Sequence, residues 1–139
     1  MCPTEMRGER LRKVKISVID VTFDEERARK YAPKGYGLCE LHSVGQVFYS
    51  NGWQKPTGLC DNAWNCMRDY VLAISQGAGY IYGDGGFTNR EGMVIVSCND
   101  GIRPVIFKVE RTDMVADTWN EDLNTVRDRH KDPNDTSTK

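Results

Sequence analysis

Long apolar runs are missing from this sequence. No stretch approaches the roughly 20 consecutive apolar residues that a membrane-spanning helix needs. The first twenty residues carry charges where a secretory signal would have an apolar core. We therefore expect no membrane partner and a cytoplasmic location.

An excess of charge of either sign is also missing. The chain of 139 residues has 19 basic and 20 acidic side chains, which gives a net charge of -1. The main basic run is MRGERLRKVK, near the start of the chain. Because nucleic-acid binding depends on a basic surface, this balance argues against a nucleic-acid partner.

Cysteines are present, but their number does not suit a disulfide framework. The five cysteines are Cys2, Cys39, Cys60, Cys66 and Cys98. An odd number in a chain long enough to bury a core indicates reduced thiols instead of structural disulfides. Reduced thiols are free to bind a metal or to react.

Hydrophobic periodicity predicts a single α+β domain. Four segments rich in β-branched or aromatic residues read as strands, at 14–23, 46–51, 93–98 and 102–111. Two segments with capping residues and apolar residues at helical spacing read as helices, at 24–32 and 62–76. We expect a mainly antiparallel, twisted sheet of about four strands, with both helices packed on one face.

Two of these elements carry further information. In VKISVIDVTF the apolar residues change from one face to the other partway along, which predicts a bulge or burial on both sides. We therefore place this strand in the centre of the sheet. At the second helix, Asp61 or Asn62 can act as the N-cap.

Composition divides the chain into four segments. Residues 1–12 are polar and charged and read as a flexible arm ahead of the domain at 13–112. Residues 113–130 have a weak helical spacing of apolar residues, which predicts a helix that docks on the domain or forms a homo-oligomer with a second copy. Residues 131–139 read as a disordered tail.

Three cysteines lie at the ends of predicted elements, where a rigid scaffold often holds functional side chains. Cys60 comes just before the second helix, where amide groups and the helix dipole stabilise a thiolate. Cys98 ends the third strand, and Cys39 lies in a glycine-flanked loop. We expect the three thiols to converge in the catalytic site of a thiol-dependent enzyme.

Polar neighbours of these cysteines extend the predicted site. Asp61 and Asp100 are candidate catalytic acids or bases. Arg103 is a candidate for binding a carboxylate or phosphate, because its planar guanidinium group meets two oxygens at once. Trp64 is a second candidate for binding the substrate, at the same cleft. This set predicts a small anionic metabolite as the substrate.

The stretch GAGYIYGDGGF, at 77–87, holds five glycines in eleven residues. This composition predicts a mobile loop with exposed aromatic side chains. The loop lacks the Lys-Ser/Thr ending of a phosphate-binding loop and the preceding strand of a dinucleotide-binding motif. We expect it to cover the cysteine site as a lid.

Two other functions are compatible with the same residues. Cys39 and His42 form a Cys-x-x-His pair that could bind zinc together with Cys60 and Cys98. The same thiols could instead hold iron or an iron–sulfur cluster. Alternatively, the cysteines are small apolar core residues, and the protein is a non-catalytic subunit or interaction protein.

Ordered motifs link the chain to a known pattern. They are KVKISVIDVTFDEE, GLCELHSVGQVF, PTGLCDNAW, YVLAISQG and SCNDGIRPVIFKVER. From about residue 12 to residue 112 the chain resembles a family of small uncharacterised prokaryotic proteins with three cysteines in this order. The resemblance implies that Cys39, Cys60 and Cys98 act as a set. It also implies an aromatic or apolar residue at the position of His42, which argues against zinc.

Overall fold

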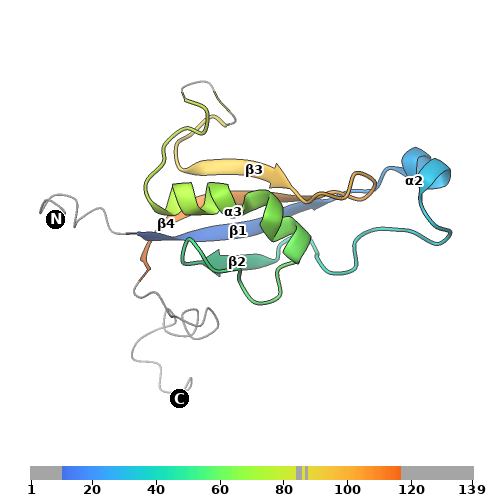
Figure 1. Ribbon diagram of the computed structural model, residues 1–139, viewed down its shortest axis with the longest axis horizontal. Coiled ribbons are helices and arrows are strands. Elements are labelled where there is room, and N and C mark those ends of the chain that lie inside the picture. The colour runs from blue at the N-terminus through green and yellow to red at the C-terminus, as the bar shows by residue number, and fades with distance from the viewer. Residues whose placement is uncertain (1–10, 84–85, 87, 117–139) are drawn as a thin grey trace, which may run out of the picture.

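Two long strands form the centre of the sheet. The computed structural model describes residues 11–83, 86 and 88–116. In this part of the chain, four antiparallel strands in the order β2-β1-β4-β3 carry two helices, which confirms the predicted α+β class (Figure 1). The elements are β1 (Arg12–Val21), α2 (Glu25–Tyr31), β2 (Val47–Ser50), α3 (Asp61–Ser75), β3 (Met93–Ser97) and β4 (Val105–Val115).

The first strand, β1, lies between β2 and β4, as the change of face in its sequence predicted. Its register with β4 shifts between Val18 and Asp20, which is the position of a bulge or similar irregularity. Val18 is buried before the shift, whereas Asp20 is exposed and Val21 packs against the core after it. The shift therefore accounts for the change of face.

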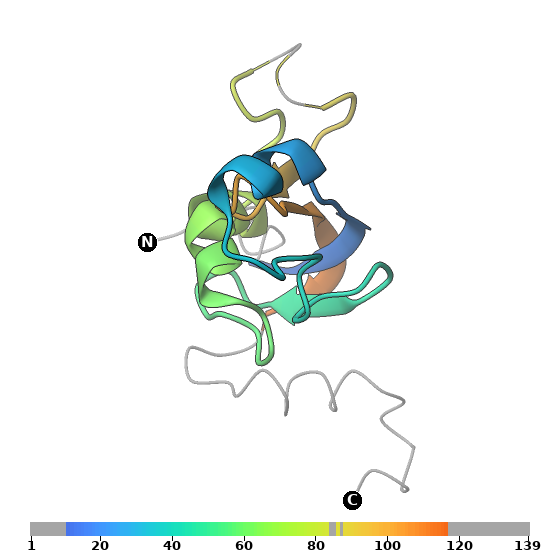
Figure 2. The same cartoon turned by 90° about the vertical axis from the view of Figure 1, so that its right-hand side faces the viewer.

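The helix α3 covers one face of the sheet (Figure 2). Its apolar residues recur at spacings of three and four, so they form one continuous stripe along the helix. Beneath it, alternate residues of β1 and β4 point toward the helix and are buried. The core consists of Val14, Ile16, Val18, Leu59, Ala63, Trp64, Met67, Val71, Ile74, Val94, Val105, Phe107 and Val109.

The helix α2 forms where the sequence predicts it, but it does not pack on the sheet. The Asp24 side chain caps it by accepting a hydrogen bond from the Arg27 amide at 2.8 Å. No residue of α2 is buried, and the helix lies beyond the end of the sheet (Figure 1). The expectation that both helices cover one face was therefore wrong for α2. The sequence EERARKY has too few apolar residues to form a stripe.

The strands extend further at both ends than the predicted domain. Arg12 already pairs with Val115, and the Ala116 amide donates to the Leu11 carbonyl at 2.9 Å. Residues 113–115 therefore belong to β4, which corrects their assignment to a docking helix. The rest of that predicted helix, 117–130, and the predicted tail, 131–139, lie outside the described residues.

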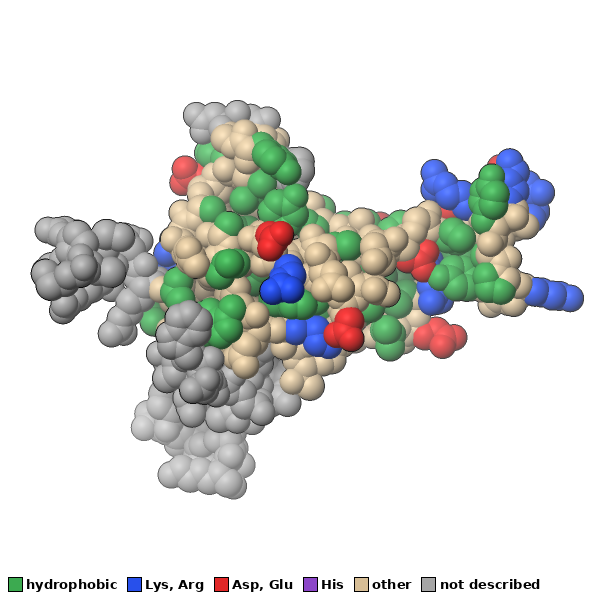
Figure 3. Space-filling model, viewed as in Figure 1, with side chains coloured by type: hydrophobic (Ala, Val, Ile, Leu, Met, Phe, Trp, Pro, Cys, Tyr) green, Lys and Arg blue, Asp and Glu red, His purple; other side chains and the backbone are tan. Residues whose placement is uncertain are grey.

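Exposed hydrophobic side chains gather at the end of the molecule that carries α2, beside Lys and Arg side chains (Figure 3). Tyr31, Leu38 and Leu41 are among the exposed hydrophobic residues of α2 and the loop after it. Within the described part of the chain, no helix has the length and apolar character needed to cross a membrane.

Gly52 lies where the connection after β2 meets the last turn of α3. Its backbone has a φ of +113°, and a Cβ atom added there would overlap the Ser75 side chain. Ser75 is buried, and its hydroxyl donates to the Leu72 carbonyl at 2.7 Å. Both the backbone conformation and the packing therefore require glycine at this position.

We expect Gly52→Ala to lower the free energy of unfolding more than Gly45→Ala does. Gly45 has a similar φ of +95°, but an added Cβ there would meet no atom within 4 Å. Backbone strain costs about 1–2 kcal/mol at either position, and overpacking adds about 1–3 kcal/mol at Gly52 alone. Urea denaturation measures both losses. Equal losses would contradict the close packing of Gly52 against Ser75.

Candidate functional site

Three connections meet at the end of the sheet that Figure 2 faces. They are the loop 32–46 after α2, the segment 98–104 between β3 and β4, and the N-terminal end of α3. Cys39 lies in the first connection, Cys98 in the second, and Cys60 immediately before α3. All three thiols pack partly buried against the core. We call this region, with these three residues, the thiol end.

Cys60 is the N-cap residue of α3. Its carbonyl accepts the first helical hydrogen bond, from the Trp64 amide at 2.9 Å. Its side chain makes no capping hydrogen bond, and the residue is partly exposed. The N-cap is thus one residue before the predicted Asp61 and two before the alternative, Asn62. The sulfur therefore lies at the positive end of a helix of 15 residues.

The buried His42 side chain holds Cys60 in this position. The Cys60 amide donates to Nε2 of His42 at 3.3 Å. The other ring nitrogen, Nδ1, lies 2.9 Å from Oε1 of Gln46. Because Nε2 must accept, the ring proton is on Nδ1, which donates to Gln46. His42 therefore binds as the neutral Nδ1–H tautomer.

Aromatic rings enclose the imidazole of His42. The rings of Phe48 and Phe107 both meet it edge to face, with centroids 5.6 Å away. Phe107 belongs to the core, and His42 is only 4% exposed. The sequence presented His42 as half of a metal-binding pair, whereas the structure uses it to join the loop 32–46 to the start of α3.

A fourth thiol, Cys66, belongs to the same neighbourhood. Burial raises the pKa of the Cys66 thiol, and the nearby sulfurs of Cys98 and Cys60 raise it further. Such an electrostatic effect requires the thiols to lie close together. Cys66 was not among the predicted site residues, because its place beside the apolar stripe of α3 suggested a core residue.

Cys98 is held by the first residue of β4. Its amide donates to the Val105 carbonyl at 3.0 Å, and its sulfur accepts from the Val105 amide at 3.3 Å. The sulfur is therefore fixed relative to the sheet. Cys39, Cys60 and Cys98 all pack against the same core, but their convergence in one site stays a prediction.

Asp100 organises the segment between β3 and β4. Its Oδ1 accepts hydrogen bonds from the Ile102 amide at 2.9 Å and the Arg103 amide at 3.0 Å. Its Oδ2 accepts from the Tyr36 hydroxyl. Burial opposes ionisation, but the hydrogen bonds from Tyr36 and these amides outweigh burial and lower the pKa of Asp100 from 3.8 to about 2. The bond to Asp100 also raises the pKa of Tyr36.

Arg103 takes part in the same cluster. Its Nε lies 3.3 Å from Oδ2 of Asp100, and its Nη1 donates to the Gly37 carbonyl at 3.4 Å. The guanidinium carbon is 4.1 Å from the centre of the Tyr36 ring. Arg103 and Asp100 thus join the loop 32–46 to the segment 98–104. Their proposed catalytic and substrate-binding roles stay predictions.

Asp61 and Trp64 occupy different environments. The Asp61 side chain is 85% exposed and forms an ion pair with Nζ of Lys55 at 2.7 Å. Trp64 is 8% exposed and belongs to the core. Asp61 is therefore accessible beside Cys60, whereas Trp64 mainly supports α3 from below.

The glycine-rich loop is at the other end of the domain. It runs from the C-terminal end of α3 to the start of β3, whereas Cys60 precedes α3 and Cys98 follows β3 (Figure 1). The loop residues of 77–87 that the structure describes therefore do not cover the thiol end. The expectation of a lid was wrong, because an antiparallel arrangement separates the two ends of these elements.

The predicted four-ligand metal site finds no support in the side-chain arrangement. Among the described residues, no group of three or more His, Cys, Asp or Glu side chains is placed to hold a metal ion. His42 also uses its Nε2 lone pair for the Cys60 amide. Zinc or iron binding by Cys39, Cys60 and Cys98 stays a prediction.

Comparisons with family models, with curated proteins and with solved structures found no match to this chain. The resemblance to a three-cysteine family stays a prediction. Fold and site together define an α+β protein with several reduced thiols at one end of its sheet.

We expect His42→Phe to lower the free energy of unfolding by about 1–3 kcal/mol. The phenyl ring fills the space between the aromatic rings but leaves the partly buried Cys60 amide without its acceptor. Urea denaturation measures the loss, and Ser43→Ala serves as the exposed neighbouring control. Equal stability of the two variants would contradict the capping role of His42.

We expect Asp100→Asn to lower the free energy of unfolding at neutral pH by about 2 kcal/mol, the energy of a pKa change from 3.8 to about 2. Because the folded-state pKa is lowered, this stability is present above about pH 4 and is lost as the pH falls toward 2. The free energy of unfolding, measured by urea denaturation at pH values from about 2 to 7, should change less with pH in Asp100→Asn than in the unmodified protein. The exposed Asp20→Asn is the control, and an equal pH dependence in both variants would contradict this account.

Proposed function

We propose that the protein is a thiol-dependent enzyme that acts on a small anionic metabolite and uses Cys60 as its nucleophile. The observation that supports this proposal is the position of Cys60 as an N-cap whose side chain makes no capping hydrogen bond. At that position the helix dipole and the first-turn amides stabilise a thiolate.

The start of α3 also favours an anionic substrate. Nζ of Lys55 donates to the Leu59 carbonyl at 2.8 Å and pairs with Asp61 at 2.7 Å, so the carboxylate of Asp61 offsets the lysine charge. The amide groups at a helix N-terminus favour anionic groups. These amides are therefore the groups that favour an anionic substrate at this end of α3.

The proposed chemical step is a nucleophilic attack. The Cys60 sulfur forms a bond to an electrophilic carbon of the substrate, such as a carbonyl carbon, and the π electrons move to the oxygen. The thiol proton has already left to solvent when the thiolate formed. His42 acts as a positioning residue, since its Nε2 is bonded to the Cys60 amide. The proposal also assumes a reducing compartment such as the cytoplasm, because the four described cysteines are free.

We expect Cys60 to be the thiol that iodoacetamide modifies fastest in the native protein at neutral pH. Mass spectrometry of samples quenched at successive times identifies the modified residue, and Cys60→Ser should remove the fast phase. Cys66→Ser and Cys98→Ser are matched controls that should retain it. Zinc and iron are measured in the same preparation, because bound metal would protect its ligands from alkylation.

Two results would contradict the proposed function. In the first, no thiol of the native protein reacts faster than the same thiol in the unfolded chain, which would leave the cysteines as core residues. In the second, stoichiometric zinc or iron protects Cys39, Cys60 and Cys98 together. The second result would favour the metal-binding alternative over the thiol-dependent enzyme.

A further inference from the structure

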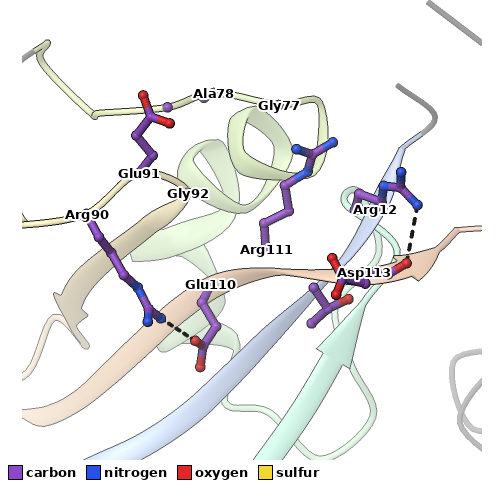
Figure 4. A pocket seen from close by; sticks show the side chains of 11 residues that line it. Arg12, Gly77, Ala78, Arg90, Glu91, Gly92, Glu110, Arg111 and Asp113 are labelled. Atoms are coloured by element: carbon purple, nitrogen blue, oxygen red, sulfur yellow. Dashed lines mark hydrogen bonds and ion pairs between the residues drawn. The ribbon is translucent and has the colours of Figure 1, made fainter. Parts of the chain in front are cut away.

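A charged cavity lies at the end of the domain opposite the thiols. It has a volume of about 430 Å³ and is bounded by the turn after α3, the segment before β3, and the strands β1 and β4. A cavity of this size accepts a small molecule. We call it the arginine pocket, and its charged side chains are Arg12, Arg90, Glu91, Glu110, Arg111 and Asp113 (Figure 4).

The pocket is lined by three arginines and three acidic side chains, which differ in their surroundings. Glu110 is only 17% exposed and pairs with two cations, Arg90 at 2.5 Å and Lys108 at 3.2 Å. The negative charge of Glu110 is therefore offset by two neighbouring positive charges. Glu91 and Asp113 are exposed, so water and salt screen their charges. Arg90 is engaged by Glu110, and Arg12 and Arg111 are therefore the guanidinium groups considered for binding an anion.

Arg111 crosses the pocket from β4 toward the turn after α3 (Figure 4). A Cβ atom added to Gly77 would lie 4.0 Å from Nη2 of Arg111, which places the guanidinium group beside that turn. Its Nε is buried, and the residue as a whole is partly exposed. A partly buried cation is screened less than an exposed one, so Arg111 attracts an anion more strongly than a fully exposed arginine does.

Arg12 extends from β1 on another side of the pocket (Figure 4). Its Nη1 donates to the Asp113 carbonyl at 3.2 Å, which orients the side chain. A guanidinium group has five N–H donors in a planar fork, a geometry that fits carboxylate and phosphate oxygens. The pairing of β1 with β4 therefore brings two such groups to one cavity.

We propose that the arginine pocket binds a small anion bearing a carboxylate or phosphate group through Arg12 and Arg111. The pocket opens beside the C-terminal end of α3, whereas Cys60 precedes the helix. The anion therefore occupies a second site, separate from the proposed thiol chemistry. An experiment that rules out anion binding in the arginine pocket therefore does not rule out thiol chemistry at Cys60, and the reverse also holds.

The test is an NMR titration of the full chain with inorganic phosphate and, separately, with succinate. Sodium chloride keeps the ionic strength constant. The chemical shifts of the Gly77, Gly79 and Gly92 backbone amides should change with anion concentration and reach a plateau with at least one of the two anions. Saturation with phosphate, with succinate or with both identifies the chemistry that the site prefers.

Two arginine variants and a matched control complete the test. Arg12→Gln should weaken binding about tenfold, the loss expected from one charge-assisted contact. Arg111→Gln should weaken it at least as much, and its circular dichroism spectrum checks that it folds. Arg29→Gln, on exposed α2, should leave affinity unchanged. Shifts that never saturate, or an affinity that Arg12→Gln leaves unchanged, would overturn the proposal.

Discussion

The buried imidazole of His42 is the contact on which the thiol end depends. It lies between Phe48 and Phe107, accepts the Cys60 amide hydrogen and donates to Gln46. These bonds join the loop before β2 to the start of α3. They supply a partner for a backbone amide just where the N-cap side chain makes no capping bond. The sulfur of Cys60 therefore lies at the helix N-terminus without making a capping hydrogen bond.

The helix α3 gives the two ends of the domain different chemistry. Its positive end carries Cys60 and favours a thiolate there, and its negative end lies beside the guanidinium group of Arg111. Both ends are fixed by packing on the same rigid sheet. A single helix thus separates the proposed thiol site from the proposed anion-binding pocket.

Local patterns predicted the elements well, because each depends on nearby residues. The alternation in β1, the Asp24 cap of α2 and the stripe of α3 all correspond to the structure. The sequence could not show the partners of His42, because the ring bonds to Cys60 and packs on Phe107, which are distant in the chain. For the same reason it did not reveal the arginine pocket, which exists only when β1 pairs with β4.

The most direct test of this account is the protonation state of His42, read from the ¹⁵N NMR spectrum of its ring at neutral pH. The account predicts a neutral ring with the proton on Nδ1, and an unprotonated Nε2 that is coupled through the hydrogen bond to the Cys60 amide. A proton on Nε2, in either the neutral or the charged ring, would contradict it, because the Cys60 amide would then have no acceptor.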